Sequence, residues 1–346
     1  MEEFLNEYAV FFAQTITIVA IIAGIFILLA SQSSEDKEDK ERLEVKKVND
    51  KYRLYAQAIE ESILPKEIVK QKRKDEKQQE KAKKKEAKTQ TEEDSESRVF
   101  VLTFNGDLKA SAVPSFSEEI TALLTVVKPE DEVLVRLYSA GGLVHAYGLA
   151  ASQLLRIRDK GIPLTISIDK VAASGGYMMA CVANKIIAAP FAVVGSIGVI
   201  AQIPNFNRLL KKHDIDFEMI TAGKYKRTLT VFGENTEEAR EKFRQEIDET
   251  HSLFQDFISE NRPQVNLEKV ATGEHWYGTK ALELNLVDSL ITCDDYLMQL
   301  SEEKSIYEIK HSPKKSLAQK FAMFANESVD KITSGVKQRS QEDQLL

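Results

Sequence analysis

The chain has 346 residues, of which 43% are apolar, so it is long enough for one substantial domain or two small ones. Its net charge of -7 argues against a nucleic acid as the main partner, because phosphate-binding surfaces usually carry a basic excess. The two cysteines, Cys181 and Cys293, lack a C-x-x-C spacing and indicate neither a disulfide framework nor a zinc site, and no cofactor or metal is predicted.

The first apolar segment runs from Tyr8 to Ala30 without a charged residue, which is long enough to cross a bilayer. Acidic residues precede it instead of the basic region of a cleaved signal peptide. Residues 1–30 are therefore predicted to be an N-terminal tail and a retained transmembrane anchor that contacts the lipid bilayer through residues 8–30. Lysines and arginines follow the span and none precedes it, so the positive-inside rule alone places the next domain in the cytoplasm.

Residues 31–97 carry 18 basic and 18 acidic residues, with few aromatic or β-branched residues after Tyr55. Such a composition predicts a charged linker, helical or disordered, that builds no core of its own. The part from Lys66 to Lys88 is locally basic and could touch lipid headgroups or an acidic partner. A run of this kind is more commonly a solvated helix or coil.

Regular alternation of strands and helices begins at Arg98. It predicts an α/β domain over residues 98–300, with a mainly parallel sheet and crossover helices. A capping pattern at Thr236 indicates a long amphipathic helix to about Glu260. Residues 301–346 read as a C-terminal amphipathic segment and polar tail. The predicted strands are 99–104, 133–137, 164–168 and 185–189, continuing after 198 and again at 217–220, and the other predicted helices are 113–127, 146–160 and 206–213.

Ser174 stands where a helix should begin, directly before Gly175 and Gly176. A serine hydroxyl attacks only when a base removes its proton and a site receives the oxyanion that forms. The backbone N–H of Gly175, at a helix start, is a candidate oxyanion donor. The loop at residues 139–142 can adopt positive φ angles and offers a second donor, for which Gly141 is preferred.

Lys226 is the candidate base, because a lysine kept neutral by apolar surroundings can accept the proton of a serine hydroxyl. Ser196, in a short glycine-flanked turn, is suited to orient the amine. Taken singly, each of these pieces is more commonly an ordinary turn or a solvated charge. Their joint presence is what indicates a hydrolase.

The order of the segments 139–142, 171–177, 195–199 and 223–226 resembles the signal peptide peptidase A family, in particular its half-length, SohB-type branch. This resemblance covers about residues 98–300. It implies that Ser174 is the nucleophile, that Lys226 is the general base and that Ser196 positions the lysine amine. It also implies that Gly175 and Gly141 are the oxyanion donors. Ala140, where family members often have proline, and Arg227, where an acidic residue is common, depart from the pattern.

The resemblance further implies a ClpP/crotonase-type fold and a homo-oligomeric ring in which neighbouring subunits complete each other's sites. The implied activity is that of a membrane-anchored serine endopeptidase of the bacterial inner membrane that cleaves hydrophobic or signal-peptide-like polypeptides. The implied location of its catalytic domain is the periplasm, which conflicts with the cation count after the span.

Two other classes stay open at this point. A crotonase-like acyl-CoA enzyme shares the fold, but it has no need for both Ser174 and Lys226. A membrane-tethered scaffold that has lost catalysis, and that binds peptides or organises a partner, is disfavoured because the chain keeps both Ser174 and Lys226. A histidine-based esterase is disfavoured, since Ser174 lacks the G-x-S-x-G elbow.

Overall fold

The computed structural model describes residues 10–18, 21, 42–86 and 97–313. The chain divides into two units, one of residues 43–311 and one of residues 1–42 with 312–346. Residues 10–18 are helical, but most of the predicted anchor at 8–30 lies outside the described residues. Within the described ranges, no helix is both long and apolar enough to span a membrane, so the anchor stays a prediction.

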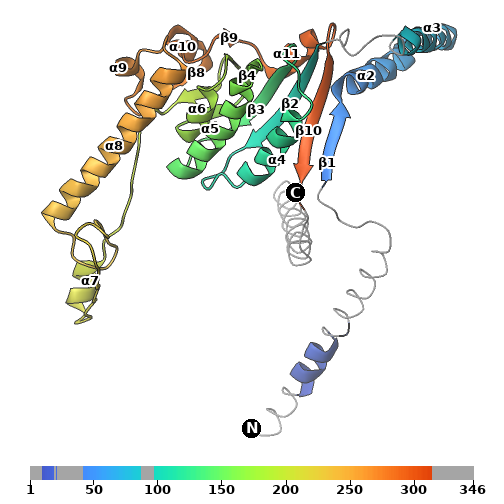
Figure 1. Ribbon diagram of the computed structural model, residues 1–346. Helices are drawn as coiled ribbons and strands as arrows, with labels where there is room; N and C mark the ends of the chain where they lie inside the picture. Colours follow the sequence, from blue (N-terminus) through green and yellow to red (C-terminus); the bar gives the residue numbers. More distant parts are fainter. Residues whose placement is uncertain (1–9, 19–20, 22–41, 87–96, 314–346) are drawn as a thin grey trace, which may run out of the picture. The chain divides into compact units, whose positions relative to one another are not determined.

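A seven-stranded sheet is the centre of the larger unit (Figure 1), with the strand order β1-β10-β2-β3-β4-β6-β9. From β10 to β9, all neighbouring strands are parallel. This confirms the predicted α/β class with a mainly parallel sheet. The strands are β1 (Arg42–Lys47), β2 (Arg98–Asn105), β3 (Glu132–Tyr138), β4 (Leu164–Ile168), β6 (Lys185–Ala188), β9 (Ser289–Leu290) and β10 (Ser305–Ser312).

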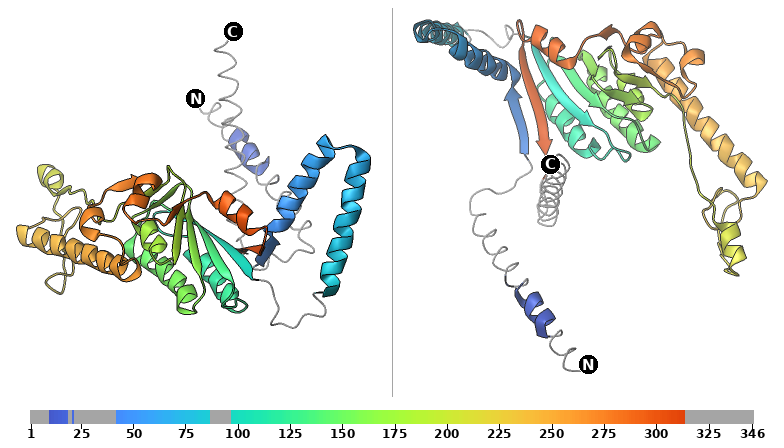
Figure 2. Two further views of the ribbon diagram at one scale, coloured as in Figure 1. Left: turned by 90° about the horizontal axis from the view of Figure 1, so that it is seen from above. Right: turned by 180° about the vertical axis from the view of Figure 1, so that it is seen from behind.

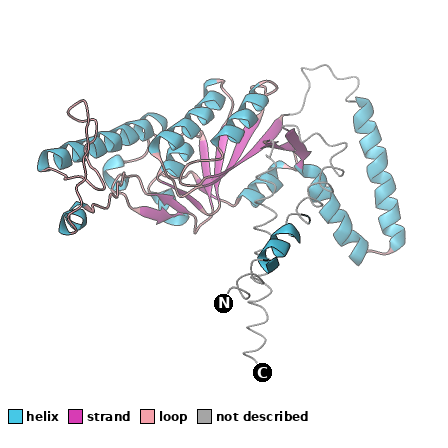
Figure 3. Ribbon diagram, turned by 90° about the horizontal axis from the view of Figure 1, so that it is seen from below, coloured by secondary structure: helices cyan, strands magenta, loops and turns pink. Residues whose placement is uncertain are grey.

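The two faces of the sheet are covered by different helices (Figure 3), because side chains of a strand point alternately to either side. In β2, Phe100, Leu102 and Phe104 belong to the main core, which also contains residues of α4 (Val113–Leu124), α5 (Val144–Asp159) and α6 (Gly175–Ala180). Val99 and Val101 instead pack with residues of α11 (Cys293–Leu300) and with the first residue of α2.

A second sheet of three strands stands beside the first and carries the loops of the candidate site. It contains β5 (Val171–Ala173), β7 (Val193–Gly195) and β8 (His275–Tyr277), in that order. Strands β5 and β7 are parallel, whereas β8 is antiparallel to β7. A bridge between Ser139 and Ala172 links the end of β3 to β5. The carboxyl ends of β3, β5 and β7 therefore converge.

Residues 199–236, which we call the arm, leave the second sheet and return at the start of α8 (Glu237–Asn261), as the two views of Figure 2 also show. The arm contains α7 (Asn207–Lys212), close to the predicted helix at 206–213. The strands predicted after residue 198 and at 217–220 are absent from this described segment, so that prediction was wrong. The cap at Thr236 is confirmed, since its hydroxyl accepts the N–H of Ala239 at 3.2 Å.

The sheet extends past both limits expected for the peptidase domain, 98 and 300. The charged segment contributes β1 and the helices α2 (Val48–Ile63) and α3 (Lys66–Glu86), so it is not only a linker. Beyond residue 300, β10 pairs with β2. Asn49 fastens these parts, because its side chain accepts the N–H of Ile306 at 2.8 Å and donates to the carbonyl of Lys304 at 3.0 Å. Two short helices, α9 (Leu267–Val270) and α10 (Gly278–Glu283), complete the unit.

Candidate active site

Ser174 lies between the end of β5 and the first residue of α6, as predicted. Its φ of 51° is unusual for a residue with a side chain, and such strain persists only where the surroundings enforce it. One constraint is the hydrogen bond from the Ser174 N–H to the carbonyl of Gly195, at 2.8 Å. The strained turn holds a half-buried hydroxyl at the end of a parallel strand.

Ser196 is brought to the same place by strand register. Ala173 pairs with Gly195, so Ser174 and Ser196 each follow the last paired residue of neighbouring parallel strands. Ser196 also has a positive φ, 52°, and its N–H donates to the carbonyl of Glu274 at 2.6 Å. The two serines are thus adjacent loop residues on one edge of the sheet.

The glycine loop after β3 contacts the turn at Ser174. Gly141 has a φ of 89°, and a Cβ added there would lie 2.8 Å from the backbone nitrogen of Gly175 and from the Cβ of Ser174. The N–H of Gly141, however, donates to the Ser139 hydroxyl at 3.1 Å. Gly142 lines the same pocket as Ser174, and its N–H has no acceptor among the described residues. Gly142 is therefore the better candidate for the second oxyanion donor.

A chain of three hydrogen bonds fixes the orientation of that loop. The Tyr147 hydroxyl donates its single proton to the carbonyl of Asp107 at 2.8 Å. It lies 2.6 Å from the Ser139 hydroxyl, which must then be the donor in that contact. Ser139 in turn accepts from Gly141. Because Ser139 and Tyr147 are fully buried, water does not compete for these groups.

The pocket beside Ser174 is small, about 20 Å³, and mainly apolar. Apolar side chains from α5, α6, the arm and α8 supply most of its wall. The residues around it are Gly142, Val144, Ser174, Gly175, Met178, Gly198, Val199, Thr250 and Phe254.

Lys226 is not brought to Ser174 within one chain. It is exposed, and its backbone N–H caps a turn at Gly223. The adjacent Lys224 pairs with Glu238, near the start of α8, at 2.6 Å, whereas Thr250 of α8 lines the pocket of Ser174. Twelve residues separate these two points, which corresponds to about 18 Å along a helix.

The neighbouring lysine is unsuited to act as a base. A hydrogen bond to the Glu238 carboxylate, and then the interaction with Tyr225, raise the pKa of Lys224 above its ordinary value. Lys224 therefore stays a charged partner of Glu238. Among the residues that the structure describes, no group of three or more His, Cys, Asp or Glu side chains could hold a metal ion.

The sequence pattern of peptidase family S49 matches residues 156–307, and that of the family's N-terminal part matches residues 3–154. A probable protease SohB of Haemophilus influenzae is 48% identical over 338 residues, which are 96% of each chain. The chain belongs to peptidase family S49. A probable protease SohB of Buchnera aphidicola is 47% identical over 302 residues, 86% of this chain and 99% of its own. The chain is accordingly a SohB-type peptidase, and the predicted resemblance is confirmed.

Among solved structures, one match is a mutant of the 1510-N membrane-bound stomatin-specific protease in complex with a substrate peptide. It is 13% identical and covers 67% of this chain and 99% of its own, with a TM-score of 0.38.

Proposed function

We propose that this peptidase is a serine endopeptidase in which Ser174 is the nucleophile and Lys226 the general base. The observation that carries the proposal is the strained turn of Ser174 at the junction of β5 and α6, beside two glycine N–H groups. The Ser174 hydroxyl attacks the substrate carbonyl and its proton passes to the lysine amine. The N–H groups of Gly175 and Gly142 receive the oxyanion. The proton then moves to the leaving amine, and water hydrolyses the acyl-enzyme.

The base comes from a neighbouring copy of the chain. Lys226 is exposed and remote from Ser174 within one copy, and a lysine serves as a base only where its amine is stripped of water. The arm that carries it exposes many large apolar side chains, a feature of surfaces that bind another protein. They include Ile200 (79% exposed), Leu209 (52%), Ile215 (52%), Phe217 (43%), Ile220 (95%) and Phe232 (44%). Assembly into a homo-oligomeric ring would bury these side chains and deliver the lysine, with Ser196 placed to orient it.

The substrates that fit this site are hydrophobic or signal-peptide-like polypeptides. The support is the apolar wall of the pocket, which includes Val144, Met178 and Phe254. The charge-free segment at residues 8–30 would hold the enzyme in the bacterial inner membrane, where such peptides are found. The periplasmic side is the one we propose for residues 98–300, and protease accessibility of this region in intact spheroplasts tests it.

Two measurements test the chemistry. A serine-reactive acylating probe should label the wild-type chain at Ser174, and casein cleavage should disappear in Ser174→Ala. Lys226→Ala should abolish both labelling and cleavage, while Lys224→Ala, which removes a surface cation two residues away, should keep both. Labelling that persists in Lys226→Ala at the wild-type rate would refute the lysine base.

Co-expression distinguishes a base in the same chain from one in a neighbour. A mixture of Ser174→Ala and Lys226→Ala chains should regain part of the wild-type activity, because some neighbouring pairs then combine an intact serine with an intact lysine. If each site were completed within one chain, the mixture would be as inactive as either variant alone.

A further inference from the structure

The hairpin of α2 and α3 exposes apolar side chains that the protein body does not cover. Tyr55, Ile59 and Ile63 are 58%, 61% and 71% exposed. Their spacing of four residues places them along one stripe of α2. Leu54 is 61% exposed, and Ile68, just after the turn, is 48% exposed. An apolar stripe on a surface helix is normally buried against something.

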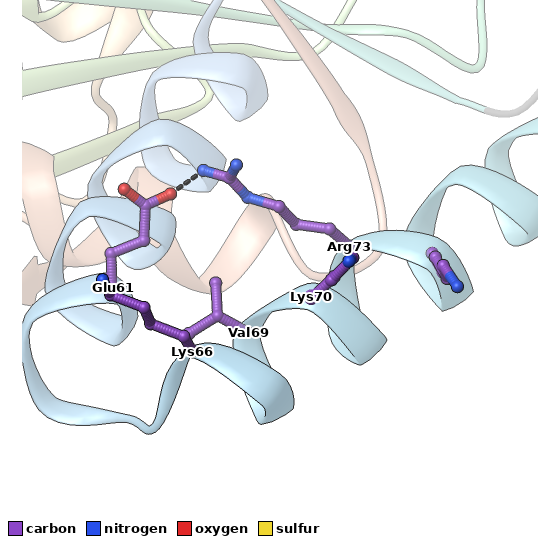
Figure 4. A pocket seen from close by; sticks show the side chains of 6 residues that line it. Glu61, Lys66, Val69, Lys70 and Arg73 are labelled. Carbon is purple, nitrogen blue, oxygen red and sulfur yellow. Dashed lines mark ion pairs between the residues drawn. The ribbon is translucent and has the colours of Figure 1, made fainter.

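The second helix of the hairpin carries an excess of positive charge. The sequence of α3 contains ten lysines and arginines against five acidic residues, in a chain of net charge -7. Lys66, Lys70 and Lys74 follow one another at intervals of four residues and line an open pocket between the helices (Figure 4). Like charges at this spacing destabilise a helix unless an anion compensates them.

Acidic groups of the hairpin compensate other cations. Figure 4 shows Arg73 reaching back to the carboxylate of Glu61 on α2. Lys72 likewise pairs with Glu60 at 2.8 Å. These two ion pairs fix α3 against α2, so Lys66, Lys70 and Lys74 keep a defined position beside α2.

We propose that the α2–α3 hairpin lies on a bilayer that contains anionic phospholipids. The apolar stripe of α2 enters the boundary between headgroups and acyl chains, and the three lysines of α3 bind headgroup phosphates. A second copy of the chain is a poorer occupant, because its α3 would bring the same positive excess to the contact. The proposal does not depend on the peptidase chemistry, and the charge-free segment at residues 8–30 gives an independent reason for the chain to meet a membrane.

The test follows a fluorescent label on the hairpin of the full-length chain, mixed with vesicles. Neither native cysteine should react with a thiol-directed dye. Cys181 and Cys293 are 0% and 2% exposed, and burial raises the pKa of the Cys181 thiol to about 12. A polarity-sensitive dye can therefore be attached selectively to Ile59→Cys. A control dye goes on Leu149→Cys, which is 52% exposed on α5.

In vesicles of phosphatidylcholine mixed with phosphatidylglycerol, the dye at position 59 should shift its emission to shorter wavelength and be quenched by lipid-attached quenchers. The dye at position 149 should stay in water. In pure phosphatidylcholine, or at high salt, the quenching at 59 should fall, because each lysine near an anionic surface contributes roughly fivefold to partitioning.

Charge reversal at Lys66→Glu, Lys70→Glu and Lys74→Glu together should abolish the quenching at 59. The matched control reverses three exposed lysines outside the hairpin, Lys212→Glu, Lys269→Glu and Lys280→Glu, and should leave the quenching at position 59 unchanged. Water exposure of position 59 in every vesicle would overturn the proposal. The proposal would also be overturned if the dye at position 59 were shielded from water without lipid, to a degree that rises with protein concentration. That result would mean that a second copy of the chain covers the stripe.

Discussion

Replacing Tyr147 by phenylalanine tests whether the buried hydrogen-bond chain sets the orientation of the oxyanion loop. The substitution removes one oxygen atom from a fully buried ring. The Ser139 hydroxyl then loses the acceptor that lay 2.6 Å away and is free to turn. Its lone pair no longer has to face the N–H of Gly141, so the Ala140–Gly141 peptide, one residue before the Gly142 N–H, loses its fixed orientation.

The size of the effect follows from the bonds involved. A buried hydrogen bond contributes about 1 kcal/mol net, and a buried polar group left unsatisfied costs about 1–3 kcal/mol. Each 1.36 kcal/mol is tenfold in rate, so we expect kcat to fall about tenfold to a hundredfold. Complete removal of an oxyanion donor costs about a hundredfold to a thousandfold, which sets the upper limit. KM should change little, because the loop acts on the oxyanion and not on the bound peptide.

Tyr177→Phe is the matched control. Tyr177 is also fully buried, lies in α6 and donates to the carbonyl of Leu286 at 3.0 Å, but it has no bond to the glycine loop. Urea unfolding should show a loss of about 1 kcal/mol or more in both variants. Peptide hydrolysis should show the loss of kcat in Tyr147→Phe alone. Equal kcat values in the two variants, with an active wild-type enzyme, would refute the role of the hydrogen-bond chain and leave the Ser174 chemistry intact.

Three further predictions concern the same unit. Gly175→Ala should abolish hydrolysis and slow labelling of Ser174, because the new Cβ would collide with the Tyr147 ring, whereas Gly148→Ala, in α5 with nothing within 4 Å of the added Cβ, should retain activity. Ser196→Ala should lower kcat in a peptide assay and change KM less. An unchanged kcat would exclude Ser196 from orienting the base. Burial opposes ionisation of Asp131, but hydrogen bonds from Arg98 and from the Lys128 N–H outweigh it and lower the Asp131 pKa below its ordinary 3.8. The stability that this carboxylate contributes is therefore fully present above its unfolded-state pKa of 3.8. It is lost as the pH falls through the lower pKa that Asp131 has in the folded chain. Asp131→Asn should destabilise the chain at pH 7 by about 2 kcal/mol in urea unfolding, and the difference should shrink below pH 3.8.

Alternating strands and helices indicated the main parallel sheet, and the glycines after Ser174 indicated the start of a helix. The meeting of Ser174 and Ser196 depends on the pairing of β5 with β7, two three-residue strands of the second sheet that were not among the predicted strands. The choice between Gly141 and Gly142 could not be made from the sequence either. It depends on the side chain of Ser139, which takes up the Gly141 N–H and is itself fixed by Tyr147, eight residues along.

Three strands of the seven-stranded sheet, β1, β9 and β10, were not predicted, and the two longer ones, β1 and β10, have weak local signals. Five of the six residues of β1 are exposed, and its only apolar residues, Leu43 and Val45, stand in a highly charged stretch. In β10, the buried Ile306 and Ile309 stand three residues apart, a spacing that does not follow the period of a strand. Both strands are held in place by tertiary contacts, including those of Asn49. Such contacts produce no regular spacing of apolar residues from which a strand could be predicted.

The position of Lys226 has a different physical origin from that of Ser174. Ser174 is fixed by strand pairing, a strained turn and a buried core, all of which one copy supplies. The lysine lies on an arm whose larger apolar side chains face water, so a single copy gives it neither a burial site nor a partner hydroxyl. If a neighbour provides both, the free energy gained by burying the arm also offsets the cost of holding the Lys226 amine uncharged. Hydrolysis would then begin only on assembly, and an isolated chain in the membrane would be inactive.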